Sequence, residues 1–340
     1  MTLTTRQDVA ALAAAHPQWF DDGRGVPSDP SPEATLIGRG ESYAAWLVIS
    51  RALADVRDPA GPRRIVVRVP HRLDELPRPM AEEFAALAAA PEGLGPRPIH
   101  LEPGDGTRGT GYQVQEFVPG QVRPATGWTD ELLAAHARQL ARLHERSYEG
   151  HGALTAAQLE PRISMVEQGE SGLAWWGENY PELTAAADVA RLWPRVRRLF
   201  EDTEPEFERL ARFALTHGDA AVPNILVSGG VPRYVDWEWA MIGDPARDLA
   251  FIGGDVWLEP WYLELGRDRL ERYLGAYVEA AGVGDPASLA VRARAWLVNE
   301  VFFVALHFRR QAQRGAGAEY AGRADTLLAR LDVALDRFSR

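Results

Sequence analysis

The chain of 340 residues contains no cysteine. This absence excludes disulfide bonds, thiolate metal ligands and cysteine nucleophiles. A protein without disulfides fits a reducing compartment, so we expect a cytoplasmic location. The first 20 residues agree with this expectation, because they show neither the basic head nor the full apolar segment of a signal peptide.

The sequence also has no apolar run close to the about 20 residues that a membrane-spanning helix requires. Basic residues are in deficit, because 37 Lys and Arg stand against 48 Asp and Glu, which gives a net charge of -11. This charge opposes binding to nucleic acid or to anionic membranes, and we expect neither partner. It would suit a cationic small-molecule substrate, or it could serve solubility alone.

The remaining composition is that of a folded protein, with 46% hydrophobic and 25% charged residues. A chain of this length exceeds one ordinary domain, which favours two lobes around a cleft.

Residues 213–251 carry the pattern with the most chemistry. Short apolar runs bounded by turn residues predict strand, loop, strand, turn and strand, with polar residues at the strand ends. Asp219, Asn224 and Asp236 stand at these positions. A carboxylate, an amide and a second carboxylate are what phosphoryl transfer needs, since one group orients the acceptor hydroxyl and two hold Mg²⁺ on the nucleotide phosphates.

His217-Gly218-Asp219 with Asn224 resembles the His-Gly-Asp-x-x-x-x-Asn loop of the aminoglycoside phosphotransferase family, which is similar in fold to protein kinases and includes macrolide phosphotransferases. Asp236 resembles the magnesium aspartate of the kinase Asp-Phe-Gly motif. The resemblance implies that Asp219, Asn224 and Asp236 are catalytic and that Asn224 and Asp236 bind the metal. A lone His-Gly-Asp is also a common turn, but three matches in register favour the kinase interpretation.

Two neighbouring segments refine this resemblance. Ala220-Ala221-Val222-Pro223 departs from the more usual Leu-His-Pro-Gly filling of the loop, which puts the role of the missing histidine in doubt. Gly243 to Ala250 matches the family's Gly-Asp-Pro-x-x-Asp-Leu-Ala. We expect Asp244 and Asp248 to support the loop first, because Asp-Pro also begins helices.

The expected nucleotide-binding residues precede this segment. Gly40 and Ser42 lie in a glycine-bearing turn between two predicted strands, where the backbone could approach phosphate oxygens or simply close a hairpin. Val66 and Arg68 share one face of a β-branched strand. By resemblance Val66 would cover the adenine and Arg68 would hold phosphates, where protein kinases have lysine; the alternative is an exposed strand arginine.

The helix predicted from Met80 to Ala90 contains Glu82 and Glu83. The family pattern assigns Glu83 to hold the strand cation, and the other glutamate is expected to be solvated. The resemblance places the hinge, whose backbone would bind the purine of ATP or GTP, at Gln115, Glu116, Phe117 and Val118, and adds Leu226 to the nucleotide contacts.

The resulting prediction is an α+β, two-lobed protein-kinase-like fold. A small antiparallel β lobe over residues 1–118 would bind the nucleotide and end in the hinge, and a mainly helical lobe over 119–340 would hold the catalytic loop and the substrate. Residues such as Trp261, Tyr262 and Glu300 in the last helical region suit a cationic ligand, or an ordinary helical bundle.

By function we expect ATP- or GTP-dependent, Mg²⁺-assisted phosphorylation of a small-molecule hydroxyl. The resemblance favours an aminoglycoside- or macrolide-type antibiotic, in resistance or self-protection. Two alternatives stay open: a kinase of a primary metabolite such as choline, homoserine or a sugar, and a nucleotide-binding module without catalysis.

Overall fold

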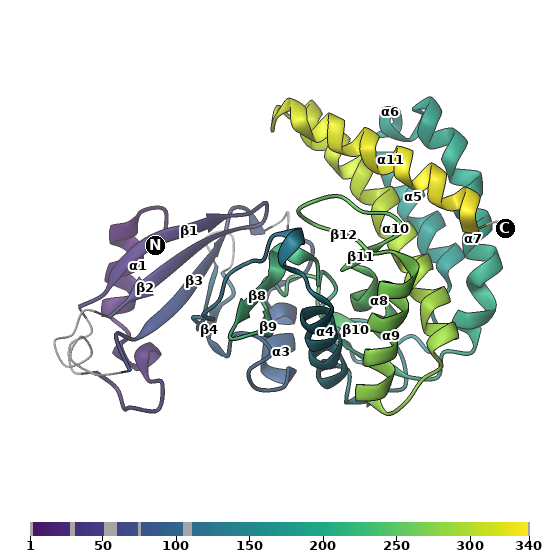
Figure 1. Ribbon diagram of the computed structural model, residues 1–340. Coiled ribbons are helices and arrows are strands. Elements are labelled where there is room, and N and C mark those ends of the chain that lie inside the picture. The colour runs from purple at the N-terminus through teal and green to yellow at the C-terminus, as the bar shows by residue number, and fades with distance from the viewer. Residues whose placement is uncertain (1–2, 28–30, 51–59, 74–75, 105–110, 339–340) are drawn as a thin grey trace. The chain divides into compact units, whose positions relative to one another are not determined.

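The computed structural model describes residues 3–27, 31–50, 60–73, 76–104 and 111–338. It contains the predicted antiparallel sheet in the N-terminal part, which has five strands, followed by the predicted mainly helical part (Figure 1). The chain forms two compact units, of which the first comprises Met1–Pro119 and Val235–Ala240 and the second Gly120–Tyr234 and Met241–Arg340. The segment that carries Asp236 therefore packs with the N-terminal unit.

The N-terminal unit is built on one sheet with the strand order β1-β2-β3-β5-β4. Its elements are α1 (Arg6–Ala14), η1 (Pro17–Phe20), β1 (Glu33–Arg39), β2 (Tyr43–Ile49), β3 (Arg64–Pro70), α3 (Met80–Ala89), β4 (Pro98–Glu102) and β5 (Tyr112–Glu116). Because side chains alternate along a strand, Ile65, Val67 and Val69 join α1 and η1 in a hydrophobic core, while Val66 and Arg68 lie on the other face.

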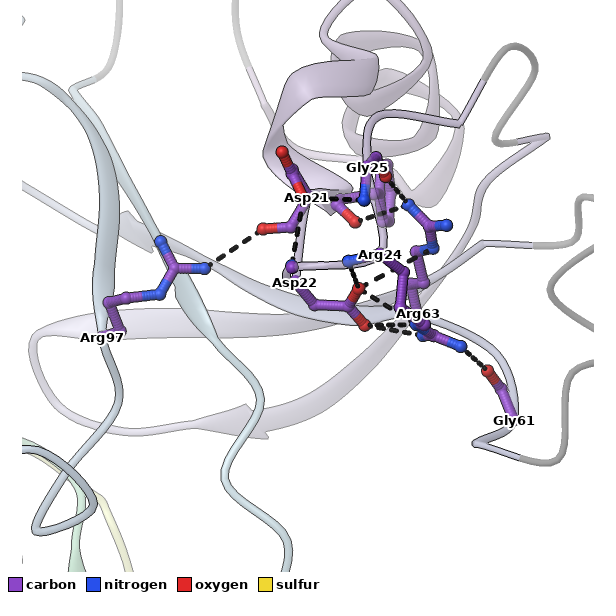
Figure 2. A network of polar contacts seen from close by, with 9 residues as sticks. Asp21, Asp22, Arg24, Gly25, Gly61, Arg63 and Arg97 are labelled. Atoms are coloured by element: carbon purple, nitrogen blue, oxygen red, sulfur yellow. Dashed lines mark hydrogen bonds and ion pairs between the residues drawn. The ribbon is translucent and has the colours of Figure 1, made fainter.

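Backbone carbonyls and arginines tie the segment after η1 to the sheet (Figure 2). The buried guanidinium of Arg63 donates to the carbonyls of Phe20, at 3.2 Å, and of Gly25. Arg97 donates to the carbonyl of Asp21 at 3.3 Å. A cavity of about 820 Å³ lies between this segment and the loop that follows α3.

Helices dominate the second unit, and α10 packs along α11 (Figure 1). Its elements are η3 (Ala125–Gly127), α4 (Asp130–Leu143), β6 (Ser147–Tyr148), α5 (Met165–Asn179), α6 (Pro181–Thr184), α7 (Ala187–Glu208), β7 (Phe213–Thr216), η4 (Val222–Asn224), β8 (Ile225–Ser228), β9 (Val231–Tyr234), β10 (Met241–Gly243), α8 (Pro245–Ala250), β11 (Gly253–Gly254), β12 (Leu263–Glu264), α9 (Arg267–Ala281), α10 (Pro286–Gln313) and α11 (Ala318–Phe338). Among the described helices, none is long and apolar enough to cross a membrane.

The order of short strands predicted for residues 213–251 is present. β7 is buried throughout and pairs with β10, and β8 and β9 form an antiparallel hairpin. Gly229 and Gly230 both have positive φ, of 57° and 79°, as a two-residue hairpin turn of the favoured type requires. The hairpin therefore begins directly after Asn224, and Asp236 follows its end by two residues.

Candidate active site

Arg68 is the centre of a charged cluster in the N-terminal unit. Its side chain is buried and forms ion pairs with Glu83 of α3 and with Asp236. Its guanidinium also lies 4.2 Å from the ring centroid of Tyr43. Burial by itself would lower the pKa of Arg68, but Glu83 and Asp236 raise it, so the guanidinium remains charged. The structure thus brings three of the sequence-predicted residues together, which we call the Arg68 cluster (Arg68, Glu83 and Asp236).

The prediction that Glu82, the glutamate of α3 without an assigned role, is solvated is wrong, because it is only 7% exposed. Glu82 and Glu83 both stand in the first turn of α3. Carboxylates are stabilised there by the positive end of the helix dipole, so burial costs them less than elsewhere.

The glycine turn joins β1 to β2 and is held by backbone hydrogen bonds. The N–H of Gly40 donates to the carbonyl of Tyr43 at 2.9 Å, and the N–H of His71 donates to the carbonyl of Ser42 at 2.8 Å. The hydroxyl of Ser42 hydrogen-bonds to Glu238, a residue that the sequence analysis did not select. The only sequence indication was its position two residues after Asp236.

Glu238 adds a third carboxylate beside Arg68. Burial, together with the charge of Asp236, raises the pKa of Glu238 to about 7. Its proton therefore offsets some of the negative charge that gathers around one guanidinium.

The expected hinge residues lie in and directly after β5. Val66 pairs with Gln115 across the β3–β5 ladder, and both side chains are buried. Glu116 accepts a hydrogen bond from the backbone N–H of Arg97, and the ring of Phe117 lies under Arg64 at 5.1 Å. Val118 is 7% exposed. Val66 and Val118 are both apolar and buried, and their contact with a purine stays a prediction.

Leu226 stands in β8 of the second unit, where the chain after the hinge meets the hairpin. Gln121 bridges to Val227, and a Cβ on Gly120 would lie 2.9 Å from the Cβ of Leu226. Only glycine fits this close approach of two backbones.

The predicted catalytic loop, His217 to Asn224, leads from β7 through η4. The side-chain amide of Asn224 donates to the carboxylate of Asp219 at 2.8 Å and to its carbonyl at 3.0 Å. Asp219 and Asn224 are therefore adjacent, and each holds the other in place.

Asp248 of α8 fastens this loop from within the core. Its fully buried carboxylate accepts hydrogen bonds from the backbone N–H groups of His217, at 2.7 Å, and Gly218, at 2.8 Å. The Nε2 of His144 lies 3.1 Å from the same carboxylate. Burial would raise the pKa of Asp248, but the hydrogen bond and the charge of His144, the charge of His217 and the backbone bond lower it below its usual value. The carboxylate is thus kept ionised as a support for the loop.

A tyrosine–glutamate pair lies beside the catalytic loop. The backbone N–H of Val222 donates to the carbonyl of Trp261 at 3.1 Å, and the hydroxyl of Tyr262 donates to the carboxylate of Glu300 at 3.1 Å. Burial raises the pKa of Tyr262 far above its usual value, and the charges of Glu300 and Asp219 add to this rise. The hydroxyl of Tyr262 therefore lies within electrostatic reach of the Asp219 carboxylate.

Each of the two expected metal ligands, taken within its own unit, has a side-chain oxygen that a cation held largely by phosphates could use. In the part of the chain that the structure describes, no three His, Asp or Glu side chains form a ready-made metal site. Mg²⁺ on a nucleotide needs only one or two protein ligands, because phosphates and water supply the others. The amide nitrogen of Asn224 donates to Asp219, so its amide oxygen is the atom that could bind a metal. The side chain of Asp236 is 42% exposed.

Behind the hairpin, His136 of α4 makes a pH-dependent contribution to stability. It is fully buried, its Nδ1 lies 2.9 Å from the hydroxyl of Tyr234, and burial lowers its pKa from 6.5 to about 3. The unfolded chain binds a proton below pH 6.5, whereas the folded protein resists it down to pH about 3. We therefore expect the free energy of unfolding to fall by about 2 kcal/mol between pH 7 and pH 5 from this residue alone.

Urea unfolding at both pH values measures this difference. The variant His136→Phe removes the titrating group and should show a smaller loss on acidification, even if it is less stable at pH 7. An equal loss in both proteins would contradict the assignment.

Comparisons with known proteins agree with this architecture. Residues 35–292 match the model of the phosphotransferase enzyme family. A thiamine kinase of Escherichia coli O6:K15:H31 is 28% identical over 263 residues, which cover 77% of each chain. Two similar solved structures are a choline/ethanolamine kinase family protein from Mesorhizobium loti (19% identity, TM-score 0.60, 97% of this chain and 95% of that one) and a streptomycin–ATP–APH(2")-IIa complex (13% identity, TM-score 0.56, 87% and 90%).

These structures confirm the kinase-like fold that the sequence predicted. The family match covers well over half of the chain and includes both the Arg68 cluster and the catalytic loop. The chain therefore belongs to the phosphotransferase enzyme family and is a small-molecule kinase.

Proposed function

We propose that the protein transfers a phosphoryl group from ATP to the hydroxyl of a small cationic metabolite. The observation that carries the proposal is the hydrogen bond of Tyr262 to Glu300, in a segment that the backbone bond from Val222 to Trp261 joins to the catalytic loop. The similarity to thiamine kinases supports a metabolite of this class over the aminoglycoside or macrolide that motif resemblance favoured. Thiamine is the first substrate to test, because it combines a thiazolium cation with a primary hydroxyl.

In this mechanism Asp219 orients the acceptor hydroxyl and takes its proton late in the reaction. Asn224 fixes the carboxylate of Asp219, while Asp248 fixes the backbone on which Asp219 stands. Arg68 would hold nucleotide phosphates, with Glu83 restraining the guanidinium. A bound Mg²⁺, for which Asn224 and Asp236 are the proposed ligands, would neutralise charge on the transferred phosphate.

The environment of Glu300 supports a cationic acceptor. Burial raises its pKa, while Arg247, the hydroxyl of Tyr262 and His307 act in the opposite direction. On α10, Glu300, Phe303 and His307 are half-buried and share one face, whereas Val301 and Phe302 face the core. A carboxylate beside aromatic rings is a suitable partner for an organic cation.

A substrate panel tests the proposal. The protein, ATP and Mg²⁺ are incubated separately with thiamine, choline, ethanolamine, homoserine, streptomycin and a macrolide, and mass spectrometry detects addition of phosphate. Phosphorylation of thiamine, choline or ethanolamine is the expected result. Phosphorylation of only a macrolide or only streptomycin would restore the antibiotic hypothesis, and nucleotide binding with no turnover of any acceptor would support the non-catalytic module.

Glu300→Gln examines cation recognition directly. Loss of the charge should raise the KM for the accepted cationic substrate about tenfold or more, with a smaller change in kcat. Glu264→Gln, an exposed carboxylate of the same unit, is the matched control and should leave KM unchanged. Equal KM values for the Glu300 variant and the parent would remove Glu300 from the substrate site.

A further inference from the structure

The residue after Asp236 occupies a tightly fitted position. Trp237 is fully buried, and its indole lies against Gly95 in the loop between α3 and β4, within the same unit. A Cβ placed on Gly95 would be 2.9 Å from the Nε1 of Trp237 and 3.0 Å from each of Cε2 and Cζ2. These separations are shorter than any ordinary van der Waals contact, so the ring leaves room only for a hydrogen at position 95.

The backbone does not itself require glycine at this position. The φ angle of Gly95 lies outside the left-handed region, in contrast to Gly93 in the same loop, where φ is 78°. The φ of Gly95 is therefore not one that only glycine favours. The contact with the indole is therefore the physical reason for a glycine here.

Asp236 needs support from its neighbours because its own backbone is strained. Its φ of 68° is left-handed, a conformation that costs a residue with a side chain roughly 1–2 kcal/mol and that aspartate tolerates better than most. Directly after it, the carbonyl of Trp237 accepts a hydrogen bond from the N–H of Ala240 at 2.9 Å, which closes a turn. The buried ring and this turn follow Asp236 directly in the chain.

We infer that Trp237 is a positioning residue for Asp236. Gly95 allows this role, because only a residue without a side chain leaves space for the indole. The inference depends on the proposed role of Asp236 as a ligand of the nucleotide's metal. It predicts that a side chain at position 95 displaces the indole of Trp237 and, with it, the carboxylate of Asp236. Metal-dependent binding of nucleotide should then weaken.

Gly95→Ala is the variant that places a methyl group against the indole. The cavity of about 820 Å³ is lined by Gly95 and by its neighbours Gly93 and Pro96, so the loop has open space beside it and the variant is expected to fold. Trp237→Phe is the complementary change. Phenylalanine lacks the outer atoms of the indole, which include Cζ2, so it leaves more room for an alanine at position 95.

The test measures binding of a non-hydrolysable ATP analogue by calorimetry, with Mg²⁺ and with EDTA, in the parent, both single variants and the double variant. We expect Gly95→Ala to weaken binding about tenfold or more in Mg²⁺ and little in EDTA. The double variant Gly95→Ala/Trp237→Phe should recover most of this loss, because the two changes compensate at one contact. Gly275→Ala in α9, where a Cβ meets nothing within 4 Å, is the control and should bind like the parent.

Other binding results would contradict either the role of Trp237 or that of Asp236. Unchanged Mg²⁺-dependent binding in Gly95→Ala, equal weakening in Mg²⁺ and EDTA, or no recovery in the double variant would overturn the role of Trp237. Absence of any Mg²⁺ effect in the parent would instead overturn the assignment of Asp236 to the metal, and the inference with it.

Discussion

Asp219→Asn should lower kcat about a hundredfold or more, while the affinity for nucleotide and the stability of the fold change little. In the proposed mechanism the carboxylate orients the acceptor hydroxyl and receives its proton, and an amide cannot take the proton. The substitution keeps the size of the side chain, and an amide oxygen can still accept the hydrogen bond that Asn224 donates at 2.8 Å. The loop should therefore keep its conformation.

Steady-state kinetics with an accepted substrate and calorimetry with nucleotide separate these effects. Asp202→Asn on the exposed face of α7 is the control and should match the parent in both measurements. If the Asp219 variant turned over its acceptor at the parent's rate, residues His217 to Asp219 could not be the catalytic loop.

Asp236→Asn is expected to behave differently, because it removes a charge from the Arg68 cluster and weakens Mg²⁺-dependent nucleotide binding as well as turnover. The contrast between the two aspartates was already available from the sequence, since each stood in a separate short motif. Asp219 and Asn224 were selected together because they stand in one loop motif, but the hydrogen bond between them was not predicted.

Contacts between distant segments were less predictable. Glu83 was selected correctly for the partner of Arg68 only through family resemblance, and the burial of Glu82 was missed because periodicity alone does not tell which faces of a short helix are covered. The Gly95–Trp237 contact joins two loops about 140 residues apart. No local pattern distinguishes a glycine that supports an indole from one that only closes a turn.

The class of substrate was also not predictable from the sequence. The motifs that carry the family resemblance end near Ala250, and the half-buried face of α10 lies beyond them. Sequence reasoning noted acidic and aromatic residues there but could not separate a ligand pocket from a helical bundle. Hydrogen bonding of Tyr262 to Glu300, together with the backbone bond from Val222 to Trp261, is what connects that region to the catalytic loop.

Asp248→Asn should be the most destabilising of the conservative substitutions discussed, with a loss of about 3 kcal/mol in the free energy of unfolding. The fully buried carboxylate accepts from two backbone N–H groups and pairs with His144. An asparagine offers one acceptor oxygen, and its NH₂ group would face a donor that then has no acceptor. The folded Asp248→Asn variant should also turn over its substrate slowly. His217 and Gly218 lose hydrogen bonds that hold the loop on which Asp219 stands.

Urea unfolding of the parent, Asp248→Asn and the control Asp255→Asn measures the first effect. Asp255 lies at the surface, 3.9 Å from Arg337, so its substitution should change the free energy of unfolding by no more than about 0.5 kcal/mol. Turnover is then compared at a temperature where both variants are folded. Equal stability losses for the two variants would show that the Asp248 network is not a structural support, whereas a normal kcat in a destabilised Asp248 variant would show that Asp219 is positioned without it.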